Sequence, residues 1–125
     1  MPSSQDEEIF TTWTKDLDVG EASVIGLCGE LDASSAPTFL NETHDVVKRR
    51  RNVIMDVNLL SYTDSTGLSA ILSIKNALQR AGKSVCLVGC HGILTKILYT
   101  ISAEDDVKCY DNIEDAIGEI GNCEL

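Results

Sequence analysis

One stretch of this 125-residue sequence gathers side chains that could do chemistry: Leu60-Ser-Tyr-Thr-Asp-Ser-Thr-Gly-Leu68. A compact apolar run at 52–57 comes before it, and after it apolar residues recur at intervals of three and four. This pattern predicts a buried strand that leads into a helix, and in open α/β folds such junctions lie at the sheet edge where ligands and partners bind. Asp64, Ser65 and Thr66 would then occupy the first helical turn, where free N–H groups and the helix dipole favour anionic oxygen.

The residues alone leave three interpretations of Ser65 open. Gly67 leaves the backbone of this stretch approachable under each of them, and the first is an ordinary helix cap. The second is a nucleophilic serine, but the stretch lacks a Gly-x-Ser-x-Gly elbow, and neither His44 nor His91 is placed by sequence as a base. The third is a kinase target, where a phosphate would add roughly −1.5 to −2 charges. The helix terminus would tolerate that charge, whereas a tightly packed or carboxylate-lined partner would not.

Strand-like and helix-like segments alternate along the chain around this stretch. The expected strands are 9–15 and 23–28, antiparallel across a turn at 16–20, followed by 52–57, 84–88 and 107–110. The expected helices begin at Ser34 or Ser35 with Pro37 in the first turn, at Ser65, at 93 and after Asn112. They end at the basic run 48–51, at Gly82, at 101 and at 120. This order predicts an α/β fold with a largely parallel sheet of five strands and about four helices.

Length and charge narrow the function classes. We expect one domain over residues 9–120, a flexible acidic N-terminus at 1–8 and a short tail at 121–125. Twenty acidic against ten basic residues leave a formal charge of −10, which disfavours direct binding to nucleic acid or to an anionic membrane. The basic run 48–51 is explained by the solvated last turn of a helix, with a recognition patch as the alternative.

The five cysteines are odd in number: Cys28, Cys86, Cys90, Cys109 and Cys123. The polar, acidic start of the chain does not resemble a secretory signal, so we expect unpaired thiols in a reducing cytoplasm. A metal site built from Cys86, Cys90 and His91 is the alternative, but the spacing matches no strong zinc signature, and we expect no metal. The longest apolar stretches fall short of the ~20 residues of a membrane span, which favours a cytoplasmic protein.

Two motifs together resemble the bacterial anti-sigma factor antagonists, which are STAS-domain proteins. The first is Gly29-Glu30-Leu31-Asp32, after the second strand, and the second is Asp64-Ser65-Thr66-Gly67-Leu68. The resemblance covers roughly residues 9–120 in element order and motif spacing. It implies a single STAS-like domain whose first strand is antiparallel to a parallel remainder, with the helices packed mainly on one face.

The resemblance also implies a function. Ser65 would be phosphorylated by an anti-sigma factor that is itself a serine kinase and binds the ATP. The unphosphorylated protein would bind that anti-sigma factor and so release a sigma factor, and a serine phosphatase would reset the switch. We therefore expect a binding protein without a cofactor or catalysis of its own. A STAS scaffold or sensor subunit of a stress-signalling or transporter-associated complex is the alternative.

Carried over residue by residue, the resemblance places Asp32 and Asp64 beside Ser65 in a docking surface, and Thr66 and Gly67 in the loop that shapes it. Leu68 and Leu72 could add an apolar contact patch, because side chains four apart share one helix face. The alternative for these two leucines is a wide core stripe. The main stripe of that helix is expected at Ala70, Ile71, Ile74 and Ala77.

Overall fold

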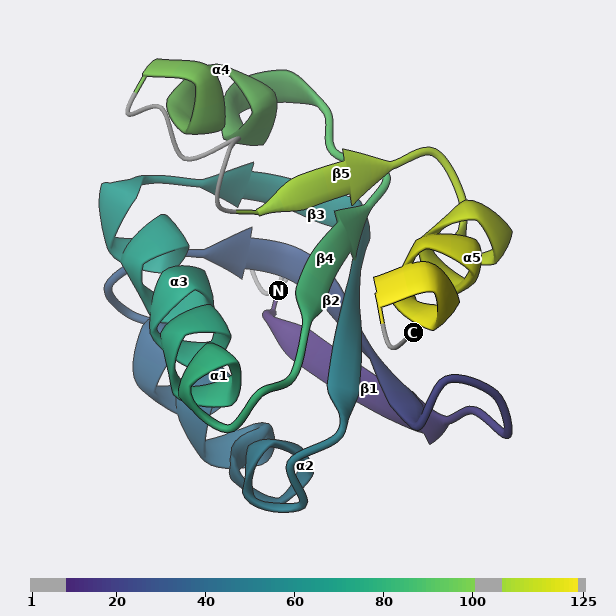
Figure 1. The fold of residues 1–125 in the computed structure, drawn as a ribbon. Coiled ribbons are helices and arrows are strands. Elements are labelled where there is room, and N and C mark those ends of the chain that lie inside the picture. The colour runs from purple at the N-terminus through teal and green to yellow at the C-terminus, as the bar shows by residue number, and fades with distance from the viewer. Residues whose placement is uncertain (1–8, 101–106, 124–125) are drawn as a thin grey trace.

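A computed structural model, which describes residues 9–100 and 107–123, contains one five-stranded sheet in the order β1-β2-β3-β4-β5 (Figure 1). β1 (Thr11–Asp16) is antiparallel to β2 (Ala22–Leu31). β3 (Asn52–Thr63), β4 (Val85–Val88) and β5 (Lys108–Tyr110) continue the sheet in parallel. The helices are α1 (Ala36–Glu42), α2 (His44–Lys48), α3 (Ser65–Arg80), α4 (Gly92–Thr100) and α5 (Ile113–Cys123). The predicted mixed sheet is confirmed.

The described residues form five helices, because the first predicted helix is two. Thr43 separates α1 from α2, and its buried hydroxyl donates a hydrogen bond to the carbonyl oxygen of Phe39 (2.7 Å). Such a bond back to the preceding turn bends helices, which explains the break. At the other end of the chain, α5 continues to Cys123, so three of the five residues expected in a tail are helical. Residues 1–8 and Ile101 lie outside the described residues.

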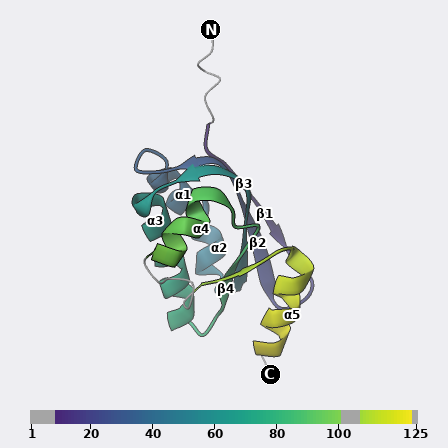
Figure 2. The same cartoon turned by 90° about the horizontal axis from the view of Figure 1, so that it is seen from above.

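The order of the strands explains where the helices lie. Each parallel strand neighbours the preceding one, and connections of constant right hand that step in one direction lie on one face of the sheet. Accordingly α1 to α4 share a face, where their apolar side chains and those of β2 and β3 form the larger core. α5 packs on the opposite face over a smaller cluster that includes Val24, Ile54 and Cys86 (Figure 2). The expectation that the helices pack mainly on one face is confirmed.

β3 runs far beyond the predicted strand 52–57. The register against β2 shifts twice, between Gly26 and Cys28 and between Gly29 and Glu30, so the polar residues after Val57 do not alternate regularly. Gly29 has a φ of +98°, and a Cβ there would lie 3.1 Å from the carbonyl oxygen of Ile9. The glycine of the first motif therefore permits the backbone of residue 9 to pass close to β2.

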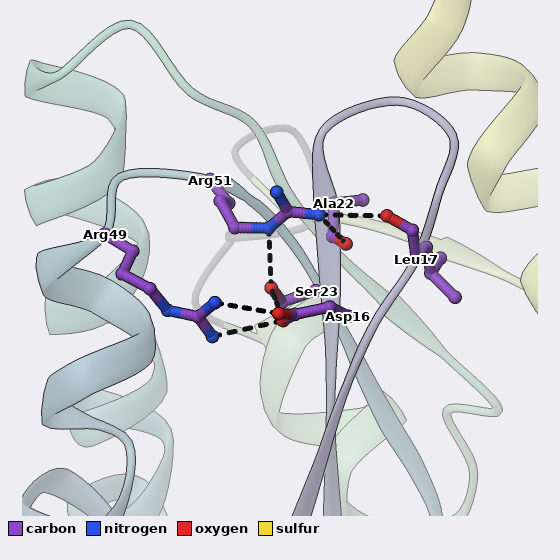
Figure 3. Close-up of polar contacts among 6 residues, drawn as sticks. All are labelled: Asp16, Leu17, Ala22, Ser23, Arg49 and Arg51. Atoms are coloured by element: carbon purple, nitrogen blue, oxygen red, sulfur yellow. Dashed lines mark hydrogen bonds and ion pairs between the residues drawn. The ribbon is translucent and has the colours of Figure 1, made fainter.

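The basic run 48–51 is partly structural (Figure 3). The Arg49 guanidinium donates two hydrogen bonds to the Asp16 carboxylate, at 2.8 and 3.1 Å. Arg51, half-buried, donates to Ser23 Oγ and to the carbonyl oxygens of Leu17 and Ala22. Lys48 and Arg49 are exposed at the end of α2, as expected for a solvated helix end, although Arg49 is also paired with Asp16. Arg51 instead ties the β1–β2 hairpin to the start of β3.

The pairing of Asp16 makes stability depend on pH. Hydrogen bonds from Arg49, and then from Ser23, lower the pKa of Asp16 from 3.8 to about 2. The folded state therefore binds fewer protons than the unfolded state between these values, so this contribution to stability is complete above about pH 5 and is lost toward about pH 2. We expect Asp16→Asn to lower the urea midpoint of unfolding at pH 6 and to converge with the original protein near pH 2. Asp18→Asn, in the exposed hairpin turn, serves as the control, and a pH-independent difference for Asp16→Asn would contradict the linkage.

The expectation of unpaired cysteines is wrong for one pair. Cys90 follows β4, Cys109 lies in the neighbouring β5, and the two form a disulfide with their Cα atoms 6.4 Å apart. Among the described side chains, Cys86 is buried and Cys28 is half-buried, and neither belongs to a disulfide. Nothing in the local sequence signals the pairing, because it depends on the sheet bringing together residues 19 positions apart.

Candidate functional site

The two motifs meet at the carboxyl edge of the sheet. Leu31 and Thr63 are the last paired residues of β2 and β3, and Thr63 Oγ1 donates to the carbonyl oxygen of Leu31 (2.8 Å). Asp32 and Asp64 follow directly on adjacent strands, whose backbones lie about 5 Å apart in a sheet. Both aspartates are half-buried. The structure thus places the two aspartates that were expected to flank Ser65 directly after adjacent strand ends, at one edge of the sheet.

Asp64 is the N-cap of α3. Its backbone is extended, and its side chain accepts a hydrogen bond from the Gly67 N–H (3.0 Å), while its carbonyl oxygen accepts one from the Leu68 N–H. A side chain in this position satisfies one of the N–H groups that a helix start leaves without an acceptor. Ser65 and Thr66 are exposed at the first turn of a 16-residue helix. The helix-cap interpretation is confirmed for Asp64, and it leaves Ser65 accessible.

Gly67 fixes how closely α3 approaches the edge of β2. A Cβ on this residue would collide with Thr63 Oγ1 and the carbonyl oxygen of Leu31, and would lie 3.0 Å from the carbonyl carbon of Leu31. Gly67 is itself buried. Its expected role in shaping the loop therefore takes a specific form, because the missing side chain lets the start of α3 sit directly against the end of β2.

The Asp32 loop is held by its own serines. Ser34 donates to Asp32 Oδ1 through its hydroxyl (2.7 Å) and its N–H (3.0 Å). These bonds, together with weaker ones from Ser35, lower the pKa of Asp32, so it carries its negative charge at neutral pH. Ser35 is the N-cap residue of α1 but makes no side-chain capping bond. Its hydroxyl instead donates to the carbonyl oxygen of Glu30 and accepts from the Asp32 N–H.

Leu68 does not form a surface patch. Its side chain is 1% exposed and lies in the larger core, so its side chain is not available to a partner. Leu72 is half-buried and packs against the same core. The wide-stripe alternative is therefore correct for this face of α3, because the face covers both the sheet and α1.

The geometry also bears on the other interpretations. His91 Nε2 lies 3.2 and 3.1 Å from the carbonyl oxygens of Val57 and Asn58, so its ring is held at the first register shift of β3. Cys90 is bonded to Cys109 and so is not a partner for Cys86 and His91 in a metal site. Within the residues that the structure describes, no three His, Cys, Asp or Glu side chains gather as metal ligands.

Two residues at the site, Thr63 and Tyr62, were not predicted from the sequence. Thr63 is buried and joins the ends of β2 and β3, whereas Tyr62 is 40% exposed beside the edge. The sequence carries no signal for Tyr62, because two exposed residues, Ser61 and Tyr62, stand between the buried Leu60 and Thr63 where a register shift interrupts the alternation.

Residues 17–116 match the STAS domain family. The fold is similar to an anti-sigma factor antagonist from Mycobacterium paratuberculosis, with 21% identity, a TM-score of 0.79, and coverage of 90% of this chain and 94% of that one. It is also similar to the Bacillus cell fate determinant SpoIIAA in its phosphorylated form, with 19% identity, a TM-score of 0.66, and coverage of 90% and 99%. The murine anion transporter Slc26a9 matches with 14% identity and a TM-score of 0.69, and this chain spans 23% of it. A search of curated protein sequences finds no match.

These structural likenesses concern the fold, because the identities are low. In the part of the chain that the structure describes, no helix is both long and apolar enough to cross a membrane.

Proposed function

Because the chain belongs to the STAS domain family, we propose that it is an anti-sigma factor antagonist that phosphorylation of Ser65 switches off. In the unphosphorylated form it would bind an anti-sigma factor in the cytoplasm and so release a sigma factor. The observation that carries the proposal is the position of Ser65, exposed at the start of α3 and next to two carboxylates at one sheet edge.

A phosphate on Ser65 would act through its position. It adds about −1.5 to −2 charges at neutral pH. The positive end of the α3 dipole and the free N–H groups of its first turn favour that charge, so the fold would remain intact. Asp32 and Asp64 already make the edge negative, and a partner that packs tightly on this edge would have to bury three anionic groups together. The same modification is thus compatible with folding and unfavourable for docking.

Two of the structurally similar proteins are named as anti-sigma factor antagonists, which supports this proposal. SpoIIAA is described as an anti-sigma factor antagonist, and structures of its unphosphorylated and phosphorylated forms share the fold of this chain. For this chain, we assign the phosphate to Ser65, which directly follows Asp64 in the second motif and is exposed at the start of α3.

The phosphate would come from the partner. We propose that the anti-sigma factor is a serine kinase that binds ATP, and that this protein has no catalytic activity of its own. The Ser65 hydroxyl oxygen would attack the γ-phosphorus, ADP would leave, and the hydroxyl proton would pass to a base of the kinase. A serine phosphatase would hydrolyse the phosphoserine to restore binding.

A second candidate is a STAS scaffold or sensor subunit of a stress-signalling or transporter-associated complex. The similarity to a segment of an anion transporter favours it. A role of that kind does not depend on phosphorylation of Ser65. A phosphorylation assay therefore distinguishes the two candidates.

We expect one phosphate to be added when the protein is incubated with ATP and a candidate anti-sigma kinase. Intact mass should rise by one phosphate, and fragmentation should place it on Ser65. Ser65→Ala should abolish the mass change, whereas Ser69→Ala, an exposed serine one turn further along α3, should leave it unchanged. No phosphate on Ser65 from an active kinase that binds the protein would refute the switch.

A further inference from the structure

The sheet face that α5 covers is exposed in part, next to the carboxyl edge of the sheet where Ser65 lies. α5 packs over the start of β2 and β3 and over β4. Toward the carboxyl edge of the sheet, β1, β2 and β3 extend beyond α5 on this face (Figure 2). The reason is topological, because the crossovers place α1 to α4 on the opposite face and leave α5 alone on this one.

Strand register shows that the exposed apolar side chains of these rows share one face. Val24 faces α5 and Leu27 faces the larger core, so alternation places Gly26, Cys28 and Glu30 on the α5 side of β2. Residues paired directly across strands share a face. We call the resulting surface the open face, and its three rows are Trp13–Gly26–Asp56, Thr11–Cys28–Leu59 and Glu30–Tyr62.

Large apolar groups stand exposed on the open face. Trp13 is 41% exposed, Leu59 67% and Tyr62 40%. They account for half of the six large apolar side chains exposed in the described part of the chain. Contiguous exposed apolar groups on a soluble domain mark interaction sites, whereas single ones do not.

Trp13 is held in place on this surface. It lies opposite Gly26 in the register, and a Cβ on Gly26 would fall on the indole ring. The absence of a side chain at Gly26 thus lets the indole lie flat across β2. An aromatic group held in one orientation loses little conformational entropy on binding, and tryptophan and tyrosine are enriched among the residues that dominate interface affinity.

The surroundings of the open face are mainly acidic. Glu30 and Asp56 belong to it, and Asp32 and Asp64 follow at the adjoining edge. Asp56 is fixed by two hydrogen bonds from Asn58. Lys15 of β1, which pairs with Val24, is a cation at the border of the open face toward α5. This charge pattern complements a basic partner and repels an acidic one.

We propose that the open face is the second half of the docking surface for the anti-sigma factor, and that it takes an apolar segment of that partner carrying lysine or arginine side chains. The inference rests on the proposed function and adds a binding surface to it. Continuity supports it, because Tyr62 precedes Ser65 by three residues and Glu30 precedes Asp32 by two. The sheet edge would sense the phosphate, while the open face would supply affinity. A second copy of this chain fits less well, since each copy carries a formal charge of −10.

The apolar part of the surface is tested by Leu59→Thr and Trp13→Thr, both of which keep a side chain suited to a strand. Each should raise the Kd for the purified anti-sigma factor by about tenfold or more, as expected for central interface residues. Val19→Thr is the matched control, because Val19 is 51% exposed in the distant hairpin turn, and its Kd should change less than about twofold. Thermal unfolding checks that each variant is folded. Unchanged affinity for folded Leu59→Thr would overturn the inference.

The charge of the surface is tested by Glu30→Lys against Asp18→Lys, which alters net charge equally at the other end of β2. Glu30→Lys should raise the Kd by about tenfold at low salt, and the effect should shrink once about 0.5 M salt screens the charges. Equal effects of the two variants would contradict a basic segment on the open face.

Failure of the inference can be told from failure of the proposed function. If the original protein forms no complex with the anti-sigma factor, both fail. If the complex forms and is lost with Ser65→Asp but retained by the open-face variants, the proposed function stands and the inference is wrong. Sedimentation that shows dimers of the original protein and monomers of Leu59→Thr, with anti-sigma binding unchanged, would assign the face to a second copy instead.

Discussion

Ser65→Asp is expected to weaken the complex with the anti-sigma factor by about a hundredfold, because a like charge placed against carboxylates inside an interface costs several kcal/mol. The measurement is the Kd by calorimetry, compared with Ser65→Asn, which has the same shape without the charge. Asn should cost far less than Asp, since only the carboxylate adds a third negative group beside Asp32 and Asp64.

Ser65→Asp should not lower the stability of the fold, although it weakens the complex. An acidic side chain in the first turn of a helix stabilises it by about 0.3–1 kcal/mol through the helix dipole. Ser65→Asp should therefore unfold at the same temperature as the original protein or slightly above it. Asn76→Asp adds the same charge about three turns further along α3 and should leave the Kd unchanged. If the Asp and Asn variants at residue 65 bind equally, charge is not the basis of the switch.

The parts of this site that were predictable from the sequence depend on local rules. An aspartate followed by polar residues and an amphipathic run predicts an N-cap, and Asp64 is one. The alternation of strands and helices likewise predicted the sheet edge on which Asp32 and Asp64 meet. Neither inference requires knowing which side chains touch across the molecule.

Other features depend on contacts between distant residues. The periodicity of α3 did not reveal that Leu68 is fully buried, because the width of a buried stripe depends on how many elements pack over it. The break at Thr43 and the extension of β3 past Val57 have a similar origin, since a side-chain hydrogen bond and two register shifts override the local pattern. The open face was not predicted at all, because it exists only where the crossovers leave one sheet face to α5 alone and α5 does not reach its far end.

Gly67→Ala should show how far the site depends on one close contact. Alanine is the better helix former by about 1 kcal/mol, so a first-turn glycine would ordinarily gain stability from the change. Here the added methyl group meets Thr63 Oγ1 and the backbone of Leu31, and overpacking of this kind costs about 1–3 kcal/mol or more. We therefore expect a net loss of about 2 kcal/mol, read from urea unfolding.

The same substitution at Gly118 provides the control for this loss, and a second change tests its cause. A Cβ on Gly118, in α5, meets nothing within 4 Å, so Gly118→Ala should stabilise the protein by about 0.5–1 kcal/mol. Thr63→Ala combined with Gly67→Ala removes the hydroxyl clash but leaves the Leu31 carbonyl, which no side-chain change can trim, so stability should recover only in part. If Gly67→Ala instead matched Gly118→Ala, α3 would be free to move away from β2. The fixed spacing between Ser65 and Asp32, on which the proposed switch depends, would then not be imposed by Gly67.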